Sequence, residues 1–218
     1  MNSLSQPKNL QDILKWEMDD LFSREKVTVL SGQNLSMGAV VGKITKGVCP
    51  ITGTAGDGNT GGGTCTGVTA GVKAKVGTYT LKCVVVQAGS GIFTVEDPDG
   101  YGLPDAKAGV AYANDQLNFT INDGSPDYAV GDIFTITIVA GSGKVKAVAS
   151  AGLIGDYDAH GILTAAVNAT GGDTEGVAIV RNARVVSANL VWPAESPLET
   201  TKWLVQLAAE GILEVSEV

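Results

Sequence analysis

The sequence predicts a mainly β protein in which one small β domain is inserted into another. Three observations carry this prediction. Short runs rich in Val, Ile and Thr recur at close spacing along the chain. Glycine accounts for 29 of the 218 residues, about twice its ordinary share, and 19 of these glycines lie between residues 47 and 143. A single helix, near the C-terminus, carries clear start and stop signals.

Strand patterns lie on both sides of the glycine-rich block. Residues 27–30 and 39–45 are typical of two strands joined by a turn. Four further apolar runs follow the block, at residues 144–149, 161–167, 176–180 and 183–186. These segments predict one β domain built from residues 27–49 and 146–218.

The two ends of the chain differ in how clearly the sequence predicts a helix. At the C-terminal end, Ser196 is expected as the helix N-cap, Pro197 as the first helical residue, and Glu199 as the partner in a capping box. Gly211 is a natural stop. Near the N-terminus, residues 10–22 fit either a helical stripe or an extended arm, and the pattern leaves both open.

The glycine-rich block predicts an inserted β-sandwich of residues 50–145. Its strands alternate between apolar and polar side chains, which places three sets on buried faces. The sets are Tyr79, Leu81, Cys83 and Val85; Leu117, Phe119 and Ile121; and Phe134, Ile136 and Ile138. Residues 53–63 and 140–143 are interpreted as flexible linkers that bound the insertion.

Charge and hydropathy exclude two classes of partner. The chain has 15 basic and 23 acidic residues, a net charge of −8, and no cluster of Lys or Arg. A nucleic-acid partner is therefore not expected, because such binding needs a basic face. No apolar run approaches the ~18 residues of a membrane span, and residues 1–10 lack the features of a signal peptide.

The reactive residue types do not assemble a catalytic or metal site. Cys49, Cys65 and Cys83 are an odd number without close spacing, which favours reduced thiols, although a Cys65–Cys83 pair stays open. The single histidine, His160, lies beside Gly161 and is interpreted as structural. We expect no catalytic residue, no metal, no cofactor and no enzymatic activity.

Two features of the glycine-rich block raise the question of whether it binds calcium or a sugar. Four acidic residues gather around a Pro-Asp-Gly turn: Glu96, Asp97, Asp99 and Asp105. Their spacing differs from that of a calcium loop and favours a hydrogen-bonded turn. Tyr101, Tyr112 and Tyr128 are able to stack on sugars, but core or turn positions are the simpler expectation.

The segments on either side of the block resemble the lambda-type head decoration proteins of tailed bacteriophages. The first stretch is SREKVTVLSGQ at residues 23–33 with MGAVVGKI at 37–44. The second is HGIL at 160–163, followed by RVV at 184–186, LVWP at 190–193 and the terminal helix. The block itself, with VEDPDG at 95–100 and VGDIFTI at 130–136, resembles a module that recurs as an insertion in phage virion proteins.

This resemblance implies a β-tulip-like decoration domain with one short C-terminal helix, interrupted by the inserted sandwich. It also implies a structural virion protein, made in the host cytoplasm, that sits on the outer surface of the expanded capsid. There it would bind the major capsid protein as a homotrimer and stabilise the shell against DNA pressure. An alternative function is a recognition module whose insert binds a host-surface carbohydrate.

The resemblance further implies where the contacts lie. Residues 1–26 are expected to form an arm that reaches the capsid, with few contacts to the rest of the chain. Candidate capsid contacts are Trp16, Met18, Ser23, Arg24, Glu25 and Val27. Candidate trimer contacts are Trp192, Pro193, Trp203 and Leu207.

Overall fold

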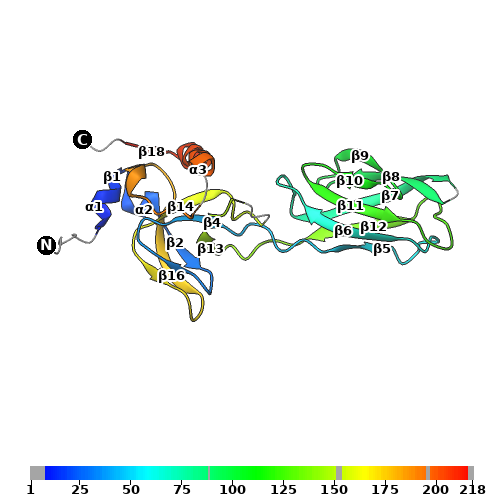
Figure 1. The fold of residues 1–218 in the computed structure, drawn as a ribbon, viewed down its shortest axis with the longest axis horizontal. Helices are drawn as coiled ribbons and strands as arrows, with labels where there is room; N and C mark the ends of the chain where they lie inside the picture. Colours follow the sequence, from blue (N-terminus) through cyan, green and yellow to red (C-terminus); the bar gives the residue numbers. More distant parts are fainter. Residues whose placement is uncertain (1–7, 88, 151–153, 195–196, 216–218) are drawn as a thin grey trace. The chain divides into compact units, whose positions relative to one another are not determined.

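The computed structural model describes residues 8–87, 89–150, 154–194 and 197–215 (Figure 1). The chain divides into two compact units. Unit 1 comprises Met1–Thr45 and Ser142–Val218, and unit 2 comprises Lys46–Gly141. Both units consist mainly of strands, so the predicted fold class is confirmed.

Unit 1 is built around a closed five-stranded barrel with the order β13-β2-β16-β14-β4. Its strands are β2 (Arg24–Val29), β4 (Val40–Lys43), β13 (Val145–Ala147), β14 (Ala159–Leu163) and β16 (Thr174–Ile179). A short ribbon pairs β3 (Asn34–Leu35) with β15 (Val167–Asn168). Val29, Val41, Val145 and Leu163 are each fully buried, because inward-facing residues alternate along the strands.

In a second layer of unit 1, segments from both ends of the described chain lie side by side. A three-stranded sheet has the order β1 (Leu14–Glu17), β17 (Ala183–Val185) and β18 (Ile212–Glu214). Around it lie α1 (Leu10–Ile13), α2 (Asp20–Ser23), the 3-10 turn η1 (Ser187–Asn189) and α3 (Pro197–Ala209). Trp203 and Leu207 of α3 are buried in one core with Ile13 and Ile162.

The terminal helix lies where the capping signals placed it. Pro197 is its first residue, and Gly211 follows it with a φ of +78°. A side chain at Gly211 would have its Cβ 2.4 Å from Oδ1 of Asn182, so glycine is required by space as well as by φ. The proposed N-cap, Ser196, lies outside the described residues.

The expectation of an arm with few contacts is wrong for residues 9–26. Ile13 is fully buried, Trp16 of β1 pairs with Arg184 of β17, and β2 pairs with β16 along its length. The helix and the extended segment expected as alternatives for residues 10–22 both occur there, because helices and a strand of four residues each alternate along this stretch. Each piece is too short to establish a period in the sequence.

Unit 2 is one antiparallel sheet of eight strands with the order β10-β11-β6-β5-β12-β7-β8-β9. The strands are β5 (Thr52–Ala55), β6 (Thr64–Ala70), β7 (Gly77–Gln87), β8 (Ser90–Glu96), β9 (Gly102–Lys107), β10 (Ala111–Ala113), β11 (Leu117–Asn122) and β12 (Ile133–Ile138). The two edge strands, β9 and β10, lie next to each other, so the sheet wraps around its core (Figure 1).

Strand β5 turns the corner between the two halves of this sheet. Gly53 pairs with Cys65 of β6, whereas Thr54 pairs with Thr135 of β12. A Cβ on Gly53 would lie 2.9 Å from the Cys65 sulfur, so the corner has no room for a side chain. The two faces expected of a sandwich are therefore halves of one continuous sheet.

The alternation predicted for unit 2 holds with one exception. The predicted core residues of β11 and β12 are all at most 2% exposed, as are Tyr79, Leu81 and Cys83 of β7. Val85 was predicted to follow them but is exposed. The pairing of β7 with β8 shifts between Cys83 and Val85, and this bulge ends the alternation, since Val84, Val85 and Val86 are all exposed.

The glycine-rich stretch 53–63 is not a linker; it lies inside unit 2 and is fixed there. Both carboxylate oxygens of the buried Asp132 accept backbone hydrogen bonds of 2.8 Å, from Thr60 and Gly61. A Cβ on Gly63 would lie 1.8 Å from the hydroxyl of Tyr128. Glycine is needed here because the backbone packs so closely against a neighbouring side chain that a Cβ would not fit.

Candidate interaction surface

The most exposed group of large apolar side chains in unit 1 lies on residues 16–22, here called the apolar loop. Trp16, Met18, Leu21 and Phe22 are 53%, 63%, 91% and 47% exposed. Their neighbours in sequence, Asp19 and Asp20, are exposed and polar. Exposed apolar side chains gathered on one segment and rimmed by polar groups are typical of an interaction site.

The apolar loop is held in a defined conformation by short-range caps and a distant backbone group. The side chain of Asp19 caps α2 by accepting a 2.9 Å hydrogen bond from the backbone of Leu21. The carbonyl of Asn182 accepts two hydrogen bonds, from the backbone of Met18 at 3.2 Å and from the hydroxyl of Ser23 at 3.1 Å. Both ends of α2 are therefore tied to the same residue.

Two ion pairs lie beside the loop. Arg24 donates from Nε and Nη2 to the two carboxylate oxygens of Glu17, at 2.9 and 2.5 Å, and this pairing raises the pKa of Arg24. Arg181 forms an ion pair with Glu25. Because these charged groups already bind each other, the exposed apolar side chains are the part of this surface most available to a partner.

The six predicted capsid contacts are thus separated into three groups. Trp16 and Met18 are exposed. Arg24 and Glu25 are half-buried in ion pairs. Ser23 and Val27 are buried within unit 1, so their side chains offer little or no surface for a contact. Leu21 and Phe22 were not among the predicted residues, although they are exposed beside Trp16 and Met18; their apolar character between Asp20 and Ser23 was the available signal.

An open groove borders the loop on the side of α1 and β1. It has a volume of about 430 Å³. Its lining consists of Leu10, Gln11, Leu14, Lys15, Trp16, Glu17 and Arg24. The groove and the loop share Trp16, so they form one continuous surface.

The predicted trimer contacts also divide by burial. Trp203 and Leu207 are at most 1% exposed within unit 1 and have no surface to offer a second copy. Trp192 is half-buried and stacks on Trp203, with ring centres 6.0 Å apart and planes 7° from parallel. The outward side of α3 instead carries Leu198 and Val205, which are 81% and 65% exposed.

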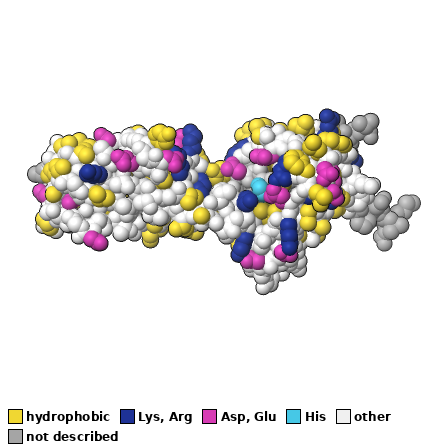
Figure 2. Space-filling view, turned by 180° about the vertical axis from the view of Figure 1, so that it is seen from behind, with side chains coloured by type: hydrophobic (Ala, Val, Ile, Leu, Met, Phe, Trp, Pro, Cys, Tyr) yellow, Lys and Arg dark blue, Asp and Glu magenta, His cyan; other side chains and the backbone are white. Residues whose placement is uncertain are grey.

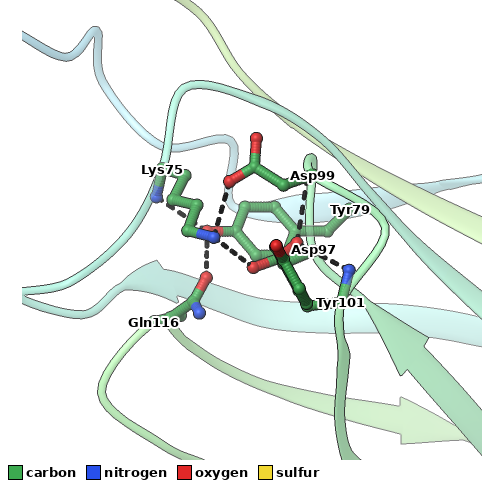
Figure 3. A network of polar contacts seen from close by, with 6 residues as sticks. All are labelled: Lys75, Tyr79, Asp97, Asp99, Tyr101 and Gln116. Carbon is green, nitrogen blue, oxygen red and sulfur yellow. Dashed lines mark hydrogen bonds and ion pairs between the residues drawn. The ribbon is translucent and has the colours of Figure 1, made fainter.

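The acidic turn of unit 2 is a network of polar contacts (Figure 3). Lys75 Nζ contacts Asp97 at 2.5 Å and Asp99 at 2.7 Å, and it lies over the ring of Tyr101. Asp97 also accepts backbone hydrogen bonds from Asp99 and Tyr101. The ammonium of Lys75 and these donors lower the pKa of Asp97, as expected for a hydrogen-bonded turn.

The remaining candidates for chemistry are structural groups. All three cysteines are free thiols, and burial raises the pKa of Cys65 to about 11. Burial lowers the pKa of His160, which reaches the surface of unit 1 beside basic and acidic side chains (Figure 2). Of the sugar-stacking candidates, Tyr112 and Tyr128 are buried, and only Tyr101 is exposed.

The described part of the chain contains neither a cluster of metal-ligating side chains nor a helix that could span a membrane. No three His, Cys, Asp or Glu side chains lie together in a way that would hold a metal ion. None of the helices within residues 8–215, as far as these are described, has the length and apolar character needed to cross a membrane.

An ordered, exposed apolar surface on a mainly β unit is typical of a protein that acts by binding another molecule. Comparison with known proteins identifies the family. The family described as "Bacteriophage lambda head decoration protein D" matches residues 3–212, and the chain belongs to it. Membership gives the chain a structural role in decorating the phage capsid, and so a location on the virion.

Other comparisons add no further relative. No curated protein matches the chain. Two crystal structures of FlgL from Xanthomonas campestris are similar to it, at 18% and 16% identity. They cover 51% and 56% of this chain with TM-scores of 0.32 and 0.31, and the chain spans about a third of the length of FlgL, 34% and 33%.

Proposed function

We propose that the protein binds as a homotrimer to the outer surface of the expanded phage capsid and stabilises the shell against the pressure of packaged DNA. The observation that carries this proposal is the apolar loop. Met18, Leu21 and Phe22 are exposed on a turn whose backbone is tied to Asn182. In a capsid decoration family, such a surface fits a contact with the major capsid protein.

The energetics of this contact are favourable. Burying a large apolar side chain contributes about 1.5–3 kcal/mol relative to leaving it exposed. Because the loop is already ordered, little conformational entropy is lost on docking. Three copies in one trimer would engage the shell together, which raises the overall avidity well above that of one copy.

The outward face of α3 is the surface we assign to the contact between copies. Leu198 and Val205 lie seven residues apart and are both exposed, so they share one side of the helix. Trp192 and Pro193 lie half-buried in the segment that leads to this helix. Cyclic closure around a three-fold axis matches the symmetry of a capsid site.

The test is binding to purified expanded capsids that lack decoration protein, measured by co-sedimentation. We expect the double variant Leu21→Ser with Phe22→Ser to bind at least tenfold more weakly than the unaltered protein. Val130→Ser is the matched control, because Val130 is 67% exposed and belongs to unit 2. Equal binding by the double variant would place the capsid contact elsewhere.

A further inference from the structure

We propose that Arg181 is a positioning residue for the apolar loop: it holds Phe22 in the conformation that docks, without contacting the capsid itself. This inference rests on the proposed function of the loop. It assigns a role to a residue 159 positions away from Phe22 in the sequence.

Arg181 contacts the loop and its flank in three ways. Its Nη1 donates a 2.6 Å hydrogen bond to the backbone carbonyl of Phe22. The guanidinium carbon lies 5.4 Å from the centre of the Phe22 ring, in the range of a cation–π contact. Nη2 pairs with the carboxylate of Glu25. One planar group thus fixes the backbone and the ring of Phe22 at once.

The loop needs such a tether because α2 is short. It has four residues, Asp20–Ser23, and a single turn of helix is marginal without tertiary contacts. The Phe22 carbonyl lies at its C-terminal end, where helix carbonyls lack intrahelical partners. Arg181 satisfies that carbonyl with a cation, which is the favourable charge at this end.

The segment that carries Arg181 runs alongside the loop. Val180 donates its backbone N–H to the Ser23 carbonyl at 2.9 Å, and Asn182 accepts from Ser23 and Met18. Residues 180–182 therefore form a rigid support whose one long side chain is directed to Phe22. The Arg181 side chain is 33% exposed, while Phe22 is 47% exposed.

A double-mutant cycle on capsid affinity tests this role. We expect Arg181→Ala to weaken binding about three- to tenfold, since Phe22 must then be ordered on docking. Arg181→Lys keeps the charge beside Glu25 but loses the planar fork, so it should bind with an intermediate affinity. Lys73→Ala, which breaks an exposed ion pair with Asp115 in unit 2, is the matched control and should bind normally.

The decisive comparison is made in the Phe22→Ala background. There, Arg181→Ala should have a clearly smaller effect on affinity, because the ring that it positions is gone and only its hydrogen bond to the backbone carbonyl of residue 22 remains to be lost. An equal loss of affinity in both backgrounds means that Arg181 contacts the capsid directly and overturns the inference. Full binding by Arg181→Ala together with weak binding by Phe22→Ala also overturns it, but leaves the proposed function intact. Full binding by Phe22→Ala also overturns the inference, and it leaves Met18 and Leu21 as the contacts of the proposed function, which the double variant tests.

Discussion

The hydroxyl of Ser23 donates a hydrogen bond to the backbone carbonyl of Asn182, 3.1 Å away. Asn182 has a φ of +44°, and its own N–H donates to the carbonyl of Glu210, at the end of the terminal helix. The apolar loop and the C-terminal end of α3 are therefore joined through one residue. The surface proposed to bind the capsid is an integral part of unit 1.

Replacing Ser23 by Ala should destabilise unit 1. The substitution removes one of two hydrogen bonds to the partly buried carbonyl of Asn182 while the bond from Met18 remains, so we expect a loss of about 0.5–1.5 kcal/mol. Denaturant unfolding measures this free energy. Ser31→Ala, at an exposed site, should change it by less than about 0.5 kcal/mol. A loss no larger than that of the control would show that this hydrogen bond does not stabilise the fold.

Gly211→Ala should also destabilise unit 1, for two separable reasons. The φ of +78° costs an L-residue about 1–2 kcal/mol. The new Cβ would also lie 2.4 Å from the side-chain oxygen of Asn182. In an Asn182→Gly background only the first cost remains, so the effect of Gly211→Ala on unfolding free energy should be smaller there. Identical effects in both backgrounds would refute the contact.

The stability of unit 2 should fall in acid through Asp97. The folded-state pKa of Asp97 is lowered, first by Lys75 and then by backbone donors. A carboxylate with a depressed pKa stabilises the fold above its unfolded value, near 4, and this contribution is lost as the pH falls through the folded value. Asp97→Asn should therefore be less stable than the unaltered protein at pH 7.

The acid dependence is the diagnostic part of this prediction. The difference between Asp97→Asn and the unaltered protein should shrink as the pH falls below about 4, when the wild-type carboxylate becomes protonated. Thermal unfolding of each protein between pH 2 and pH 7 measures it. A difference that stays constant over this range would show that the carboxylate charge plays no part.

Unit 2 should be removable without loss of attachment. Ile44 and Lys144 are already joined by a 2.9 Å backbone hydrogen bond, and Gly143 donates back to Ile44. A short Gly/Ser turn in place of residues 46–141 should therefore close as a hairpin. We expect a folded protein that still binds capsids, checked by circular dichroism and co-sedimentation. Aggregation of this variant would mean that the two units depend on one core.

The sequence predicted those features that a regular pattern encodes. Leu117, Phe119 and Ile121 were assigned correctly because β11 keeps a period of two along its length. Val85 was assigned to the wrong face because a bulge interrupts that period, and nothing in the residue types marks its position. The packing role of Gly63 depends on Tyr128, which no local pattern connects to it.

The candidate surface was predicted only in part, for a similar reason. Trp16 and Met18 were assigned as contacts, but an apolar residue in a sequence is equally suited to a core and to a docking surface. Trp203 and Leu207 were placed at an interface, and the structure uses them in the core of unit 1. The sequence could not show that residues 22 and 23 lie against residues 180–182. Ser23 bonds to Asn182 and Arg181 bonds to Phe22, and both are tertiary contacts between segments far apart in the chain.

Electron microscopy of expanded capsids saturated with this protein is the most direct test of the proposed contact between the apolar loop and the capsid. We predict three copies around each local three-fold axis, with Met18, Leu21 and Phe22 buried against the major capsid protein and unit 2 directed into solvent. Density in which these three side chains remain exposed, or in which unit 2 makes the contact with the shell, would contradict it.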